Sequence, residues 1–111
     1  MNPGDLYYAE VPFADRPGSK SRPAVVIEAL SAKTVLVLAS TSQFNPNLRL
    51  IHSIDFNRPK YTRIRRNGLG GTSYFCGSSL KVLELSNFQR FLGPLRPEDF
   101  KQIANGLKRE T

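Results

Sequence analysis

The sequence of 111 residues has one cysteine, one histidine, no tryptophan and no long hydrophobic run. The single cysteine, Cys76, cannot form a disulfide within the chain, and with a single histidine no zinc site of the usual spacing can be assembled. The longest uninterrupted apolar stretch is residues 35–39, whereas a helix needs roughly 20 apolar residues to cross a bilayer. The first residues have neither the basic nor the apolar region of an export signal. These absences favour a protein of the reducing cytoplasm with no metal, no cofactor and no membrane span.

Hydrophobic residues make up 40% of the chain, too many for a disordered tail. A chain of this size buries about two thirds of its unfolded surface. Residues 1–111 are therefore expected to form one domain whose core needs no disulfide or metal. The motifs GxSxG, HExxH and GxxxxGK, which mark serine hydrolases, zinc proteases and P-loop NTPases, do not occur.

The net charge of +7 is concentrated in the middle of the chain, where residues 49–66 contain six basic side chains and one acidic side chain. Phe56 and Tyr61 are interleaved with these cations. Cations that attract phosphate, next to rings that stack on bases, indicate a polyanionic partner. A well-solvated surface strand and its loop would show the same pattern, so charge alone does not decide. The six basic residues are Arg49, Arg58, Lys60, Arg63, Arg65 and Arg66.

Runs of β-branched, leucine and aromatic residues between turn signals predict a mainly β fold with a C-terminal helix. The helix begins at Pro97, which suits a first helical position. A shorter helical turn is expected from Ser86, with Gly93-Pro94 ending it, and polar surface loops are expected at 14–22 and 65–73. Short strands plus one helix point to a small barrel or curled sheet. The predicted strands are 5–13, 24–30, 34–40, 48–56, 73–76 and 80–85.

An ordered set of motifs covers nearly the whole chain: GDLYYAEVPF, PGSKSRPAVVIEA, TVLVLASTSQ, NGLGGTSYF and FLGPLRPEDFKQI. This order resembles the MazF/PemK/Kid family of toxins from type II toxin–antitoxin systems. The resemblance implies a small SH3-like barrel, a homodimer, and a metal-independent endoribonuclease that cuts single-stranded RNA at short sequences and leaves a cyclic phosphate. It also implies inhibition by an acidic, partly disordered antitoxin, a partner that a +7 chain suits.

The resemblance assigns the catalytic roles to Arg22 of SRPAVV and Thr41 of ASTSQ. A guanidinium binds phosphate oxygens in pairs, and a threonine hydroxyl donates to a nonbridging oxygen. A solvated loop arginine and a strand end that caps a turn are the bland interpretations of these two residues. Charge, position and side-chain chemistry add expected RNA contacts at Lys20, Ser42, Gln43, Arg63, Arg65 and Arg66.

Several RNA-cleaving members carry an arginine and an aspartate after the NGL loop, where this chain has Cys76 and Ser78. Lys81, Arg63 or Arg65 could compensate for the missing pair. Two alternatives stay open: a relative of the same fold that poisons DNA gyrase, and a noncatalytic barrel that binds nucleic acid. His52 lies among apolar neighbours and is expected to be structural.

Overall fold

The computed structural model describes residues 1–13 and 15–110, apart from the side chain of residue 110. Within this part of the chain, six strands form one sheet in the order β4-β5-β3-β2-β1-β6, and all neighbours are antiparallel. The strands are β1 (Asp5–Pro12), β2 (Ser19–Ala29), β3 (Thr34–Thr41), β4 (Leu50–Asp55), β5 (Thr72–Glu84) and β6 (Phe88–Pro94). The helices are the 3-10 turns η1 (Pro59–Tyr61) and η2 (Leu85–Asn87), and the α-helices α1 (Thr62–Arg66) and α2 (Pro97–Glu110).

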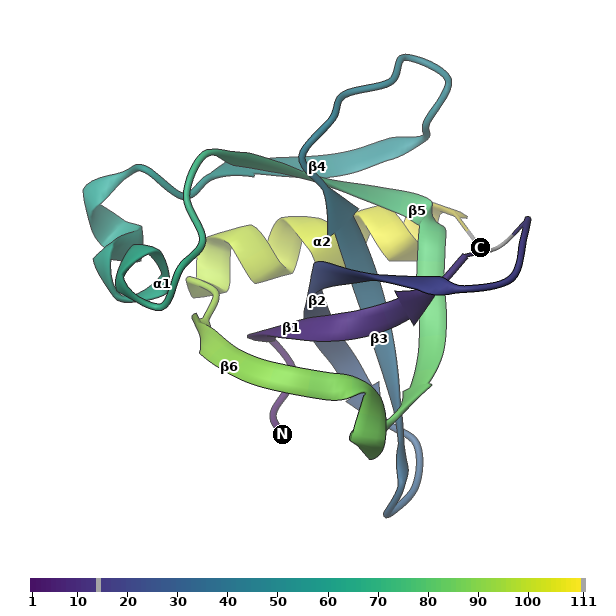
Figure 1. Cartoon of the computed structure of the whole chain (residues 1–111). Coiled ribbons are helices and arrows are strands. Elements are labelled where there is room, and N and C mark those ends of the chain that lie inside the picture. Colours follow the sequence, from purple (N-terminus) through teal and green to yellow (C-terminus); the bar gives the residue numbers. More distant parts are fainter. Residues whose placement is uncertain (14, 111) are drawn as a thin grey trace.

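The sheet curls into a barrel-like shell, with α2 lying across one side of it and α1 beyond the end of β4 (Figure 1). The predicted mainly β fold with a C-terminal helix is therefore confirmed. No helix in residues 1–13 and 15–110 combines the length and the apolar character that a membrane crossing requires.

Alternating residues of the strands pack on the two faces of the sheet. Leu6, Val25 and Leu38 face the helices, together with Ile103 of α2, and all four side chains are fully buried. Their neighbours along the strands face the inside of the curl. That inner cluster contains Ala9, Val11, Ala24, Val26, Val35, Val37, Ala39 and Leu83. The period of two in the sequence thus supplies two cores, one under α2 and one inside the curled sheet.

The second half of the sheet differs from the sequence prediction. The stretches 73–76 and 80–85 belong to one long strand, β5, because residues 76–79 form an extended bulge that joins them. The prediction of a helical turn from Ser86 to Gly93 holds only for the 3-10 turn η2. Beyond η2 it is wrong, because residues 88–94 form β6 and pair with β1. Phe88 and Phe91 pack on the ring of Tyr7, with centroids 5.3 and 5.0 Å apart. Aromatic cross-strand packing of this kind favours a strand over the helical turn that the local sequence predicted.

Two predicted loops are shorter than expected. Strand pairing resumes at Ser19, so Lys20 and Arg22 lie in β2 and pair with Val11 and Ala9. Residues 15–18 of the predicted loop 14–22 form no regular structure, and residue 14 is outside the described part. The predicted loop 65–73 begins within α1 and ends within β5.

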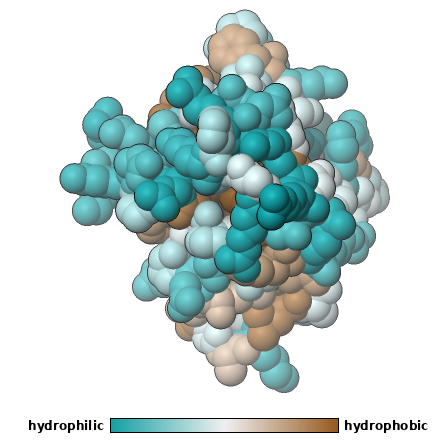
Figure 2. Space-filling view, turned by 90° about the vertical axis from the view of Figure 1, so that its left-hand side faces the viewer, coloured by the Kyte–Doolittle hydropathy of each residue, from teal (hydrophilic) through white to brown (hydrophobic). Residues whose placement is uncertain are grey.

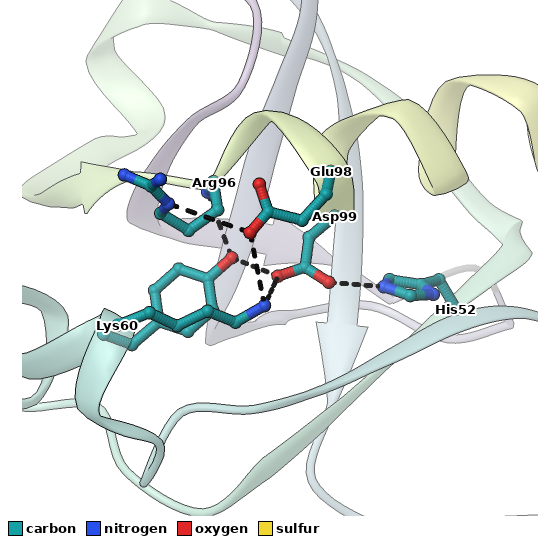
Figure 3. Close-up of polar contacts among 6 residues, drawn as sticks. His52, Lys60, Arg96, Glu98 and Asp99 are labelled. Carbon is teal, nitrogen blue, oxygen red and sulfur yellow. Dashed lines mark hydrogen bonds and ion pairs between the residues drawn. The ribbon is translucent and has the colours of Figure 1, made fainter.

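The start of α2 is tied to the rest of the fold by Asp99 (Figure 3). Its carboxylate accepts hydrogen bonds from the Tyr61 hydroxyl and from His52 Nε2 at 2.9 Å, and it lies 3.1 Å from Lys60 Nζ. The Tyr61 hydroxyl also accepts the backbone N–H of Arg96 at 3.0 Å. The His52 ring is thus held against Asp99 at the start of α2, and its expected structural role stays a prediction.

Burial alone would raise the pKa of Asp99, but the hydrogen bonds from Tyr61 and His52 and the Lys60 ammonium outweigh it, so the pKa lies below its ordinary value. Burial and the hydrogen bond to Asp99 raise the pKa of Tyr61. A carboxylate with a lowered pKa stabilises the fold above its unfolded pKa of about 3.9, and this stability is lost as the pH falls through the folded pKa.

We predict that Asp99→Asn lowers the free energy of unfolding at pH 7 by about 1–3 kcal/mol, because the three donors lose a charged acceptor. The difference from the wild type should shrink as the pH falls through the pKa of Asp99, where the wild-type carboxylate becomes protonated. Urea unfolding at several pH values measures both effects. Glu98→Gln is the control, because Glu98 precedes Asp99 on α2 but has an exposed side chain. An Asn variant as stable as the control at pH 7 would contradict the prediction.

Candidate functional site

The site begins where the hydrogen bonding between β2 and β3 ends. The ladder between these strands runs to the pair Ala24 and Ala39. The next residue of β2 in this direction is Pro23, which precedes Ala24 in the chain. It has no N–H with which to continue the pairing. Beyond this point β2 pairs with β1, and β3 pairs with β5. Continuing the β2–β3 register by two residues brings Arg22 level with Thr41, so the two residues expected to be catalytic lie across the end of this ladder.

Arg22 and Thr41 line two adjoining cavities, which also share Ser40. One cavity has a volume of about 330 Å³ and opens on the inner face of the sheet, and the other has a volume of about 200 Å³. The larger cavity is lined by Val11, Pro12, Phe13, Arg22, Ala39, Ser40, Thr41, Leu48, Ser78, Ser79 and Lys81. The smaller cavity is lined by Tyr8, Lys20, Ser21, Arg22, Pro23, Ser40, Thr41, Ser42, Leu69, Gly70, Thr72 and Ser73.

Hydrogen bonds hold the ends of both strands. The Ser40 hydroxyl donates to the carbonyl oxygen of Pro23 at 3.0 Å, so it links β3 to β2 where the backbone ladder has ended. The Thr41 hydroxyl oxygen accepts the backbone N–H of Gln43 at 3.2 Å. Thr41 therefore does cap a turn, as its bland interpretation proposed. Its hydroxyl hydrogen can still donate to a ligand, because that bond uses only a lone pair.

The residues that line these two cavities carry positive charge only. Lys20, Arg22 and Lys81 contribute cations, and none of the described lining residues is an aspartate or a glutamate. Hydroxyl groups from serine and threonine side chains surround the cations. Across residues 1–13 and 15–110, no group of three or more His, Cys, Asp or Glu side chains is arranged to hold a metal ion. This combination of cations and hydroxyl donors suits a phosphate group.

The bulge of β5 forms one wall of the larger cavity. Leu80 pairs with Leu38 and Phe75 pairs with Ser40, so residues 76–79 lie across from Ala39. Ser78 and Ser79 thereby reach the cavity. Cys76 is 2% exposed, and burial raises the pKa of its thiol. A buried thiol with a raised pKa is a poor nucleophile, so Cys76 belongs to the core rather than to the reactive groups of the site.

The other predicted contact residues divide into two groups. Lys20 and Ser42 line the smaller cavity with Arg22 and Thr41, and Gln43 follows one residue beyond Ser42. The three arginines of α1 line neither cavity. The Arg63 guanidinium lies 5.4 Å from the centre of the Phe91 ring, and Arg66 is exposed.

Arg65 has a different environment from its neighbours on α1. Its Nη1 atom donates to the carbonyl oxygens of Phe56 and Arg58, each at 2.6 Å, and Nη2 donates to Thr62 at 3.2 Å. Its guanidinium thus holds the chain segment that leads from β4 into η1. The space-filling view of the side that carries α1 is mainly hydrophilic, with hydrophobic residues in separate patches (Figure 2).

Two residues next to the site were missed by the sequence reasoning. Tyr8 lines the smaller cavity, and the Arg90 guanidinium lies 5.3 Å from the centre of its ring. Both also line an adjoining open hollow with Ser21 and Gln89. The wrong helical prediction for residues 86–92 concealed Arg90, because only the pairing of β6 with β1 brings it opposite Tyr8.

The model of a family described as PemK-like, MazF-like toxin of type II toxin–antitoxin system matches residues 2–110. No curated protein matches the sequence at a significant level. Among solved structures, an endoribonuclease from a mycobacterial species in complex with its cognate antitoxin is similar, with a TM-score of 0.67 and 12% identity over 98% of this chain and 92% of that one. The Mycobacterium tuberculosis toxin MazF-mt6 is similar with a TM-score of 0.65 and 15% identity, over 95% of this chain and 93% of that one.

At these identities the two structures establish the shared fold, while the family model spans nearly the whole sequence. The chain therefore belongs to the family of PemK-like, MazF-like toxins of type II toxin–antitoxin systems.

Proposed function

We propose that this toxin is a metal-independent endoribonuclease, an mRNA interferase that cuts single-stranded RNA at short sequences. The observation that carries the proposal is the placement of Arg22 and Thr41 across the end of the β2–β3 ladder, where both line the same two cavities. The similar mycobacterial structure described as an endoribonuclease in complex with its cognate antitoxin supports the proposal. We expect the enzyme to act in the cytoplasm, where its messenger RNA substrates are found.

In the proposed reaction the 2′-hydroxyl of the RNA attacks its own phosphorus. The bond from phosphorus to the 5′ oxygen breaks, leaving a 2′,3′-cyclic phosphate on one fragment and a 5′-hydroxyl on the other. The proton lost by the 2′-hydroxyl is balanced by the one that the 5′ oxygen gains. Because the nucleophile belongs to the substrate, the protein's task is to bind the phosphate and to stabilise the charge that develops on it.

Arg22 is the proposed source of that stabilisation. Its guanidinium is a cation that can donate two hydrogen bonds to the phosphate oxygens. Thr41 donates a third hydrogen bond to a nonbridging oxygen. The pairing of Arg22 with Ala9 in β1 holds its backbone in a regular strand, so its guanidinium starts from a defined position.

The flanking nucleotides are proposed to contact the remaining polar residues. Lys20 and Ser42 lie in the smaller cavity, and Gln43 is close enough in the chain for its amide to reach a base edge. Arg63 and Arg66 on α1 lie outside the two cavities and would attract RNA phosphates further along the strand. We propose that Arg65 contributes to RNA binding indirectly, by holding the turn that precedes α1. Its guanidinium already donates to three groups of the protein.

Arg22→Ala should reduce RNA cleavage by at least about 10²-fold, which is the usual loss when one donor to a developing oxyanion is removed. A long RNA is incubated with each protein in EDTA, and the new 5′ ends are mapped. Arg109→Ala is the control, because Arg109 is an exposed arginine in the last turn of α2. Intact RNA with the wild-type protein would overturn the nuclease proposal and favour the noncatalytic or gyrase-poisoning relatives.

The contribution of Thr41 can be tested by removing its hydroxyl while keeping its shape. Thr41→Val should lower kcat by about 10²-fold, because the donor to the phosphate is lost. Thr41→Ser should keep most of the activity, since it retains the hydroxyl. Circular dichroism would establish that both variants are folded. Equal rates for the two variants would show that the threonine serves only to cap its turn.

The second partner that we propose is an acidic antitoxin. The net charge of +7 and the absence of carboxylates among the described residues of the two cavities make this region attractive to an acidic segment. Such a segment would occupy the same cations as RNA and would exclude it. A similar solved structure is described as a complex with its cognate antitoxin.

A homodimer is the proposed assembly. Leu80 and Val82 of β5 are 41% and 59% exposed, and they share a face of the sheet with Leu36, which pairs with Val82. An apolar hollow of about 560 Å³ adjoins them, lined also by Ile27 and Leu107. An apolar surface of this kind supports burial against a second copy.

If a second copy covers this face, the double substitution Leu80→Lys and Val82→Lys should convert the dimer into a monomer in sedimentation velocity. Charged side chains would otherwise be buried without partners in the interface. Phe44→Lys is the control, because Phe44 is 58% exposed and lies on the separate loop between β3 and β4. A wild-type protein that stays monomeric at 100 times the concentration used in the cleavage assay would contradict the proposed interface. A double variant at Leu80 and Val82 that stays dimeric would contradict it as well.

A further inference from the structure

Lys81 is a half-buried cation in the larger cavity of the site. It pairs with Val37 across β5 and β3, so its side chain lies on the inner face of the sheet. Leu83, two residues further along β5, is buried in the inner core with Val37. Thr41 is four residues beyond Val37 in β3 and therefore faces the same way. The apolar stem of Lys81 thus begins at the inner core, and the side chain borders the cavity that Arg22 and Thr41 line.

Neither cation of this cavity is neutralised within the described chain. No hydrogen bond or ion pair joins the Lys81 ammonium or the Arg22 guanidinium to residues 1–13 or 15–110. Lysine normally avoids burial unless its charge is paired or reaches water. Two cations with no counter-charge, beside the hydroxyls of Thr41, Ser78 and Ser79, form a cavity suited to a group with more than one negative charge.

Three basic residues could replace the arginine and aspartate pair that this chain lacks, and their surroundings distinguish them. The guanidinium of Arg65 donates to backbone carbonyls and to Thr62. Arg63 lies against the Phe91 ring. Neither lines a cavity with Arg22, whereas Lys81 does. The geometry therefore selects one of the three.

We propose that Lys81 is a catalytic residue of this toxin, whose ammonium donates to a nonbridging oxygen of the phosphate that is cleaved. Arg22 and Lys81 would then approach the phosphate from β2 and β5, on opposite sides of β3. As the 2′-oxygen attacks, the phosphate gains a second negative charge, and two cations stabilise that charge better than one. The inference rests on the proposed nuclease function and adds a residue to its site.

Two measurements test this role separately. Lys81→Met keeps the length of the side chain and removes its charge, and Lys81→Arg restores the charge. Lys101→Met, on the exposed side of α2, is the matched control. The first measurement is the affinity for a 2′-O-methyl single-stranded RNA, which cannot be cleaved, over a range of salt concentrations. The second is the single-turnover rate on unmodified RNA in EDTA.

For Lys81→Met we expect the slope of log affinity against log salt to decrease by about 0.7, the value for one lost phosphate contact to a single strand. The cleavage rate should fall by about 10²-fold. Lys81→Arg should recover the slope and most of the rate, and Lys101→Met should match the wild type in both. If the Met variant does not fold, Lys81→Gln takes its place in the same comparison.

The outcomes separate this inference from the function on which it rests. Wild-type cleavage with an equally fast Lys81→Met variant would overturn the role of Lys81 and leave the nuclease intact. Wild-type RNA binding without cleavage would overturn the nuclease and, with it, the catalytic role of Lys81. In that case the slope would still show whether the ammonium contacts phosphate. A protein that neither binds nor cuts RNA would overturn both.

Discussion

The end of the hydrogen-bond ladder between β2 and β3 is the constraint on which the candidate site depends. Pro23 has no N–H to give, and from this residue onward each strand is paired only with its other neighbour. Two regular strands therefore carry Arg22 and Thr41 past the point where they are bonded together. The Ser40 hydroxyl keeps the two strand ends connected by its bond to the Pro23 carbonyl. The site is thus an interruption in a sheet whose other pairings hold the functional side chains in place.

At the start of α2, charged groups are paired within the fold. Around Asp99 a carboxylate, an ammonium, a phenol and an imidazole satisfy one another and tie α2 to the turn after β4 (Figure 3). Arg65 is likewise occupied by backbone carbonyls. The cations at the end of the β2–β3 ladder have no such partners among the described residues. Net charge therefore says less about ligand binding than the distinction between cations that the fold uses and cations that it leaves available.

Local patterns predicted the parts of the fold that depend on local chemistry. Runs of β-branched, leucine and aromatic residues located β1, β3 and the second half of β2, and Pro97 marked the start of α2. The patterns failed where distant pairing decides. Phe88 and Phe91 become strand residues because they pack on Tyr7. The α1 helix, with five residues, is too short to produce a clear periodic signal.

Local patterns predicted less of the candidate site than of the fold. Arg22 and Thr41 came from the family resemblance, since they lie far apart in the chain and no local pattern pairs them. Tyr8 and Arg90 were missed because their contact needs the pairing of β1 with β6. The bonds of Asp99 to Tyr61 and His52 span 38 and 47 residues, which no spacing rule covers. Long-range contacts of this kind become visible only when the sheet order is known.

The bulge of β5 separates the shape of the cavity wall from the orientation of the core side chains beyond it, two properties that a regular strand would couple. In a regular ladder, inserting one residue reverses the orientation of every side chain beyond it. Residues 76–79 already lie outside the register of β3, which resumes at Leu80. Changes of sequence or length at residues 77–79 can reshape the wall of the cavity while Cys76 and Leu83 stay in the core. A lineage of such proteins could diversify the RNA sequences it recognises at this position without having to evolve a new fold.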